Sequence, residues 1–145
     1  MSKVPVPPTT LAICLTGQYL LMRQRAVTPT SATVAAVLSL ASGSLVVGSL
    51  WEFRRQRTSF DPVDVEAATS LVVRGPNRLT RNPMYLGMAG LLAAHAILRR
   101  SAVAVLPMAA FVLVMGRVQI PLEEKALKAR FGADYGRYRG SVPRW

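Results

Sequence analysis

Apolar residues gather in four long runs along the chain, which cover residues 9–22, 32–51, 84–98 and 102–116. Charged residues stand between these runs rather than within them, which is the pattern of helices whose middle parts lie in a bilayer. The second run would span about 30 Å as a helix, which is enough for the hydrocarbon core. The third would cover only about 22 Å and needs help from flanking residues. The pattern predicts an all-α, multi-span membrane bundle of about four transmembrane helices.

Two features refine this bundle. Arg99, Arg100 and Ser101 alone separate the third run from the fourth, which predicts a tight helical hairpin whose long basic side chains reach the far interface. Ser44 and Gly48 are small residues four positions apart, and they predict a face on which another helix packs closely. Whether the first run spans the bilayer fully stays open.

Basic residues are unevenly distributed if all four runs span. One side would hold fourteen of them, namely Lys3, Arg54, Arg55, Arg57, Arg74, Arg78, Arg81, Arg117, Lys125, Lys128, Arg130, Arg137, Arg139 and Arg144. The other side would hold Arg23, Arg25, Arg99 and Arg100. Because cytoplasmic segments carry an excess of Lys and Arg, we expect both termini in the cytoplasm, with the bundle in a bacterial inner membrane.

Composition narrows the class further. The chain is 51% hydrophobic, and the net charge of +11 follows from basic residues at membrane interfaces, so we expect membrane lipids and a lipophilic substrate rather than nucleic acid as partners. Cys14 is the single cysteine and His95 the single histidine, so we expect no intrachain disulfide and no metal site. His95 falls near the far interface and is assigned a structural role. The start "MSKVPVPPTT" lacks a strongly basic head and a cleavage site, so we expect the first run to be retained.

The stretch "LTRNPMYLG", residues 79–87, carries the first candidate chemistry. Asn82 is a favoured N-cap and Pro83 a favoured first helical residue, so a helix should begin here with its free amides and positive dipole end at the cytoplasmic interface. Arg81 adds a cationic fork that suits a carboxylate or phosphate. Tyr85 offers an aromatic face and a hydroxyl, and Gly87 removes bulk nearby. These residues predict an anion site, although capping and interfacial anchoring alone would explain the same pattern.

The stretch "RVQIPLEEKALKARFGADYGRYRGSVPRW", residues 117–145, carries the second. Pro121 at the start and Gly132 at the stop predict a short helix of about eleven residues. Glu123 and Glu124 in its first turn could stabilise the helix dipole or accept hydrogen bonds from ligand hydroxyls or an ammonium. Arg117 stands at the end of the fourth run, where its side chain could reach to the interface.

Together the two stretches suit a ligand that has an anionic group, an ammonium and hydroxyls. S-adenosylmethionine has a carboxylate, an ammonium, ribose hydroxyls and a sulfonium. A simple phosphate ligand would gain nothing from Glu123 and Glu124.

The motifs "RNPMYLG", "EE" and "FGADYGRYRGSVPRW", in this order, resemble those of a family of integral-membrane methyltransferases. This family is related to isoprenylcysteine carboxyl methyltransferase and to phospholipid N-methyltransferases. Its pattern is Arg-His-Pro-x-Tyr-x-Gly, then paired glutamates beyond a helical hairpin, then a Phe-Gly-x-x-Tyr-x-x-Tyr tail. The resemblance runs from about Phe53 to Trp145. Asn82 stands at the usual histidine position; its amide can bond a carboxylate but cannot become charged.

The resemblance implies one integral-membrane methyltransferase domain over residues 1–145, with divergent N-terminal helices in 1–53, a cofactor-binding part in 54–145 and a short cytoplasmic C-terminal helix and tail. It implies methyl transfer from S-adenosylmethionine to a carboxyl, thiol or amine group of a lipophilic acceptor. Arg117 is the speculative residue for substrate orientation. The implied cofactor-binding residues are Arg81, Asn82, Pro83, Met84, Tyr85, Gly87, Glu123 and Glu124.

Three other readings remain. In a nonenzymatic membrane scaffold or subunit, the motifs would serve only as caps and anchors, and cofactor binding would distinguish it. A reductase of the sterol-reductase type would need a nicotinamide cofactor and many more polar membrane residues. A small multidrug-type transporter would need a carboxylate inside a membrane segment, and only Glu52, at the edge of the second run, comes close.

Overall fold

The computed structural model describes residues 7–22, 26–57 and 69–145, and all regular structure in these ranges is helical. The all-α prediction is therefore confirmed for this part of the chain. Lys3, Arg23, Arg25 and most of the proline-rich start lie outside the described residues. The elements in order are α1 (Pro7–Leu21), α2 (Pro29–Arg55), the 3₁₀ turn η2 (Gly75–Arg78), α3 (Pro83–Leu98), α4 (Val105–Val114), the π-helical turn η3 (Met115–Gln119) and α5 (Ile120–Ser141).

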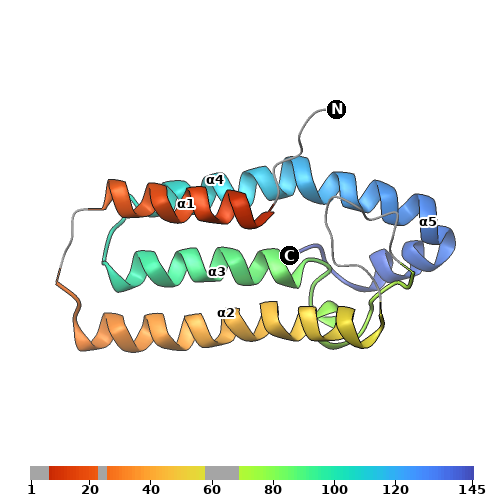
Figure 1. The fold of residues 1–145 in the computed structure, drawn as a ribbon, viewed down its shortest axis with the longest axis horizontal. Coiled ribbons are helices and arrows are strands. Elements are labelled where there is room, and N and C mark those ends of the chain that lie inside the picture. Colours follow the sequence, from red (N-terminus) through yellow and green to blue (C-terminus); the bar gives the residue numbers. More distant parts are fainter. Residues whose placement is uncertain (1–6, 23–25, 58–68) are drawn as a thin grey trace.

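The helices lie side by side with alternating chain direction, and α3 runs between α2 on one side and α1 with α4 on the other (Figure 1). Each of the four predicted apolar runs is a helix. The predicted hairpin is also present, since α3 ends at Leu98 and α4 begins at Val105. At its tip Arg100 adopts a left-handed conformation with φ of 51°, which is uncommon for a residue other than glycine.

Two helices are long and apolar enough to cross a membrane, namely Pro29–Arg55 and the continuous helix Val105–Ser141. The helix Pro83–Leu98 is apolar but shorter, so the count of about four spans stays a prediction. Large apolar side chains such as Leu20, Leu40 and Leu106 are exposed on α1, α2 and α4. Exposed apolar surface of this extent is costly in water and favourable against lipid, which fits the membrane character of the sequence.

The closest helix contact joins α2 and α3 through small residues. A Cβ atom placed on Gly87 would lie 2.6 Å from the backbone oxygen of Ser42, and one placed on Gly90 would lie 2.1 Å from the Ser42 hydroxyl. A side chain at position 87 would clash with the backbone of α2, so this glycine allows the close approach, while a side chain at position 90 would have to displace the Ser42 hydroxyl. The packing face predicted at Ser44 and Gly48 is wrong, because Ser44 is exposed and Gly48 faces η2 rather than another membrane helix.

The predicted helix start at Pro121 is not a break in the chain. Pro121 lies in the first turn of α5, but η3 joins α4 to α5 without interruption. The amide of Ile120 bonds to the carbonyl of Met115, five residues back, which is the π-helical pattern. Proline has no amide hydrogen and crowds the preceding turn, so a widened turn just before it accommodates the ring within a continuous helix.

Gly132 is where the chain turns, as predicted. Its φ of 48° and ψ of −116° lie outside the helical region, and φ in this range favours glycine. The tail beyond it is helical again, from the kink to Ser141, rather than an irregular extension. Figure 1 shows this last arm folding back toward the start of α3.

A neutral polar cluster lies at the hairpin end of the bundle. Gln18 is fully buried, and its side-chain amide donates hydrogen bonds to the backbone oxygens of Leu92 (3.1 Å) and Ala104 (2.8 Å). Its Oε1 lies 3.0 Å from Nδ1 of His95. Because an amide oxygen can only accept, Nδ1 carries the hydrogen. Gln18 thereby ties α1 to α3 and to the start of α4, which fits the structural role predicted for His95.

Candidate functional site

The opposite end of the bundle holds a charged cluster, which forms where α3 begins and α5 folds back (Figure 1). Arg81 comes just before α3, whereas Glu124 and Tyr135 come from the two arms of α5 on either side of Gly132. The Nη1 of Arg81 donates to Oε1 of Glu124 at 2.8 Å and to the hydroxyl of Tyr135 at 3.0 Å. The Arg81 and Glu124 side chains are only 10% and 15% exposed. The kink thus brings one cation, one anion and one phenol together.

Arg144 completes the ion cluster from the C-terminal segment. Its Nε lies 3.1 Å from Oε1 of Glu124, and its Nη2 lies 2.6 Å from Oε2. This two-point contact is the favoured geometry between a guanidinium and a carboxylate. Glu124 therefore lies between two guanidinium groups, and its negative charge is balanced within the protein.

The backbone of the C-terminal segment is fixed at the same place. The Arg81 amide donates to the carbonyl of Pro143 at 2.9 Å. The Arg144 carbonyl accepts from both the Thr80 hydroxyl and the Asn82 side-chain amide, each at 2.9 Å. Residues just before α3 thus hold residues 143 and 144 in one position, which in turn aims the Arg144 side chain at Glu124.

Asn82 occupies the predicted N-cap position of α3, with Pro83 directly after it in the first turn. Its side chain does not cap the helix, however, because its amide group bonds to the tail instead. Its own backbone amide is bonded to the Thr80 hydroxyl at 3.2 Å. The capping role predicted for the Asn82 side chain is wrong, since the tail supplies a carbonyl that the sequence motif alone does not reveal.

Glu123 points to a second set of partners. Its Oε1 accepts a short hydrogen bond from the hydroxyl of Tyr85 and another, at 2.8 Å, from the Gln119 amide. No cation pairs with Glu123 among the residues that the structure describes. The adjacent carboxyl groups therefore differ: Glu124 is paired with two guanidinium groups, whereas Glu123 is bonded only by neutral donors, and burial raises the pKa of the Glu123 carboxyl.

The last arm of α5, beyond its apolar part, is anchored by Tyr138. Its hydroxyl donates to the carbonyl of Asn77 in η2 at 2.7 Å, and burial raises the pKa of Tyr138 to about 12. Burial, and then the charge of Glu124, raise the pKa of Tyr135. The two rings meet edge to face with centroids 6.4 Å apart. Both phenols therefore stay protonated, and available as donors, over the ordinary pH range.

The other residues singled out in the sequence lie as follows. Gly87 is buried against α2, where packing alone accounts for it, while Pro83 is buried and Met84 half-buried in the first turn of α3. Arg117 is exposed on η3, and its side chain has no hydrogen bond or ion pair within the described ranges. The structure thus gathers Arg81, Asn82, Tyr85, Glu123 and Glu124 at one end and leaves Arg117 outside the cluster.

Sequence reasoning missed four members of the cluster. Thr80, Gln119, Tyr135 and Arg144 each bond directly to a predicted site residue or to the tail beside it. The sequence could have indicated Tyr135, because this residue falls within the tail motif that follows Gly132. It could also have indicated Gln119, because this residue stands four positions before Glu123 and such pairs meet on one helix face.

Comparison with known proteins places the chain in a family. An uncharacterized protein of Haemophilus influenzae is 37% identical over 62 residues, which are 43% of this chain and 98% of that protein. No solved structure matches the chain. The phospholipid methyltransferase family matches residues 30–134, from the start of α2 to beyond the kink in α5. Because this match covers most of the chain, the chain belongs to the phospholipid methyltransferase family, which indicates methyltransferase activity at a membrane.

Proposed function

We propose that the protein transfers a methyl group from S-adenosylmethionine to a carboxyl, thiol or amine group of a lipophilic acceptor, as isoprenylcysteine carboxyl methyltransferase-like enzymes do. The observation that carries the proposal is the cluster of Arg81, Glu124 and Glu123 between the start of α3 and α5. It lies within a chain of methyltransferase ancestry. The cofactor supplies a sulfonium-bound methyl group that an acceptor nucleophile takes by in-line displacement.

The residues present suit such a cofactor. The Nε of Arg81 is buried and has no hydrogen-bond partner among the described residues. A buried N–H without a partner is costly, so this donor is well placed for a group that arrives with the ligand. The cluster therefore combines a spare donor for a carboxylate with a carboxylate, Glu123, for an ammonium or hydroxyls.

The roles proposed from the sequence become more specific with this geometry. Arg81 and the start of α3 at Asn82 would bind the methionyl carboxylate, and Pro83, Met84, Tyr85 and Gly87 would line the same region from α3. Glu123 would bind the ammonium or the ribose hydroxyls, since its carboxyl has no cationic partner among the described residues. Glu124 would contribute mainly by holding Arg81 and Arg144 in place, because both of its oxygens are already used.

The chain's contribution to the reaction would be alignment and exclusion of water. The C-terminal segment covers the start of α3 through its bonds to Thr80, Arg81 and Asn82. Both α2 and α4 run toward this end of the bundle (Figure 1), and they expose large apolar side chains such as Leu40 and Leu106. A lipophilic acceptor could therefore approach from the lipid while the cofactor is held at the polar end. Arg117, exposed at the end of that path, keeps its speculative role in orienting the acceptor.

We further propose that this polar end, with both termini, faces the cytoplasm of a bacterial inner membrane. The support is the uneven distribution of Lys and Arg between the two ends of the bundle. Arg54, Arg55 and the basic residues of α5 lie at the cluster end, while Arg99 and Arg100 lie at the hairpin end. A reporter joined after residue 145 through a flexible linker should be active only when it is of the cytoplasmic type. A signal from a periplasmic-type reporter would overturn the topology.

The test of function is calorimetry on the detergent-solubilised protein. We expect S-adenosylmethionine and S-adenosylhomocysteine to bind and nicotinamide cofactors not to bind. The variant Glu123→Gln should weaken binding, whereas Lys125→Gln, which removes an exposed charge two residues away, should leave it unchanged. A folded protein that binds neither adenosyl compound would point to the nonenzymatic scaffold instead.

A further inference from the structure

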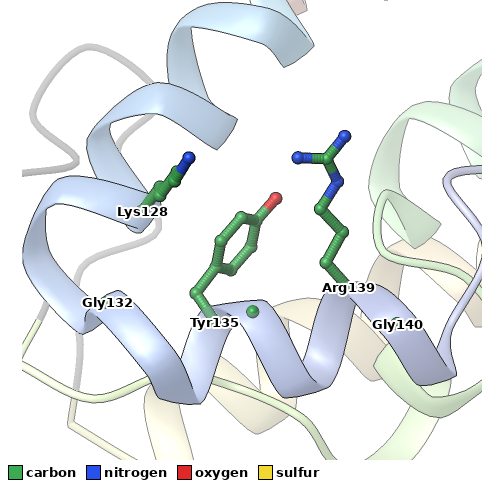
Figure 2. A pocket seen from close by; sticks show the side chains of 6 residues that line it. Lys128, Gly132, Tyr135, Arg139 and Gly140 are labelled. Atoms are coloured by element: carbon green, nitrogen blue, oxygen red, sulfur yellow. The ribbon is translucent and has the colours of Figure 1, made fainter.

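The kink at Gly132 creates a hollow of about 390 Å³ between the two arms of α5. It is lined by Lys128 on the first arm and by Tyr135 and Arg139 on the second, together with Gly132, Gly136 and Gly140. Figure 2 shows the Lys128 ammonium, the Tyr135 hydroxyl and the Arg139 guanidinium pointing into the same space. Three donors, two of them cationic, therefore converge on one concave surface.

The two cations that line this hollow are not paired with acidic side chains of the described residues. On α5, Glu124 is paired with Arg81 and Arg144, and Asp134 is paired with Arg137. Neither Lys128 nor Arg139 has an ion-pair partner within the described residues. Two cations held near each other without an anion repel, and an anionic ligand between them relieves that repulsion.

The third donor is set by the cluster next to it. The Tyr135 oxygen accepts the hydrogen bond from Arg81, so its own hydrogen is directed elsewhere. The raised pKa of Tyr135 keeps this hydrogen in place. The hollow thus offers one neutral and two charged donors, which suits an anion with several oxygens.

The glycines leave room for such a group. A Cβ atom on Gly132, Gly136 or Gly140 would meet nothing within 4 Å. Gly136 and Gly140 stand four residues apart on the last arm, so one face of that arm presents bare backbone toward open space. The packing of the protein itself does not require small residues here, in contrast to Gly87 and Gly90.

We propose that this hollow is a binding site for a phosphate group, held by Lys128, Arg139 and the Tyr135 hydroxyl. Two sources offer that chemistry, namely the headgroup of an anionic phospholipid and free phosphate. The position of the hollow, at the end of the helix that continues from the apolar α4, makes a lipid headgroup accessible to it. The proposal concerns anion binding and does not depend on the methyl transfer proposed above.

The experiment compares two charge-matched double variants of the detergent-solubilised full chain. Lys128→Gln with Arg139→Gln removes both cations of the hollow. Lys125→Gln with Arg130→Gln removes two exposed cations of the same helix that do not line it. The probes are dihexanoyl phosphatidylglycerol, inorganic phosphate and, as a separate ligand, S-adenosylhomocysteine, each titrated by calorimetry.

We expect the first variant to lose about tenfold or more in affinity for a phosphate probe and the second to change little. Binding of the lipid probe alone identifies a headgroup site, and binding of both probes identifies a site that also takes free phosphate. Equal losses in the two variants would show only diffuse attraction by the basic end. Absence of binding by both probes, or a parallel loss of S-adenosylhomocysteine binding in the first variant, would overturn the proposal.

A third variant tests the hollow without altering charge. Gly136→Leu places a bulky side chain in open space and favours the helix, so the protein should fold at least as well as the parent. We expect phosphate-probe binding to fall while the thermal midpoint holds. Undiminished binding in Gly136→Leu would show that the anion does not occupy the space between the arms.

Discussion

Two polar clusters stand at opposite ends of the same helices, and they are built differently. At the hairpin end, Gln18 and His95 are neutral, and the side-chain amide of Gln18 donates both of its hydrogens to backbone oxygens. At the other end, Arg81, Glu124 and Arg144 are charged, and their partners are side chains. The first cluster joins helices to one another, whereas the second joins the start of α3 to both arms of α5 and to the C-terminal segment.

The difference shows how to separate structural from functional polar groups in an apolar bundle. A buried amide whose hydrogens and oxygen all have partners stabilises a single arrangement and offers nothing to a ligand. A cluster with an unpartnered buried donor, such as Nε of Arg81, bears a cost that a ligand can remove. Variants at the two ends test whether stability and binding are divided in this way.

The largest effect is expected for Arg81→Ala. It removes one partner of a nearly buried ion pair and should lower the free energy of unfolding by about 3 kcal/mol. It should also reduce affinity for S-adenosylhomocysteine about a hundredfold, because both a charge and several donors are lost. Thermal denaturation and calorimetry measure the two effects. Arg81→Lys, which keeps the charge without the planar fork, should recover only part of each.

The next largest effect should distinguish the roles of Glu123 and Glu124. Glu123→Gln should weaken cofactor binding by about 1.5 to 3 kcal/mol, because it removes the charge-assisted acceptor. Glu124→Gln should instead loosen the C-terminal segment, since Arg144 loses its carboxylate. Limited proteolysis after residue 141 should then become faster in Glu124→Gln alone. If both variants behave alike in both measurements, the division of roles between the two carboxylates is wrong.

At the hairpin end, Gln18→Leu should affect stability only. The loss of two amide hydrogen bonds, and of the acceptor for His95, should lower the free energy of unfolding by about 2 kcal/mol. Affinity for S-adenosylhomocysteine should not change, because the cluster that would bind it lies at the other end. A fall in affinity at unchanged fold would contradict the separation of the two clusters.

The smallest effect concerns Tyr138 and alkaline pH. A pKa raised to about 12 means that the folded protein favours the protonated phenol. Its contribution is therefore fully present below the ordinary tyrosine pKa of about 10 and is lost as pH rises toward 12. Tyr138→Phe should cost about 1 kcal/mol at pH 8, through the bond to Asn77, and should flatten the fall of the thermal midpoint above pH 10. An unchanged alkaline fall would assign that fall to other groups.

Local signals in the sequence predicted part of this molecule well. Asn82 and Pro83 mark the start of α3, Gly132 marks the turn, and the order of the motifs placed Arg81 and Glu124 at the same end. These features depend on backbone preferences of single residues or on the direction of helices. They can be read without knowing which side chains meet.

What could not be predicted depends on contacts between distant segments. The Asn82 amide bonds to a carbonyl 62 residues away, so its capping preference was overridden. Gly87 serves the approach of α2, and a single sequence does not show which helix packs there. The cofactor roles of the cluster residues stay predictions until binding is measured.

The π-helical turn η3 has a consequence for how such sequences are compared. Each residue of an α-helix advances the chain by about 100° around the axis, and a π turn inserts one extra residue at nearly constant direction. η3 therefore acts as a phase shift between the apolar face of α4 and the polar face that bears Glu123 and Glu124. Deleting one residue within 115–119 would turn the π turn into an α turn and keep both carboxylates facing Tyr85 and Arg81, whereas deleting one residue within 105–114 would swing them by about 100°. In a relative without the π turn, the distance from the apolar run to the glutamate pair should therefore be one residue shorter.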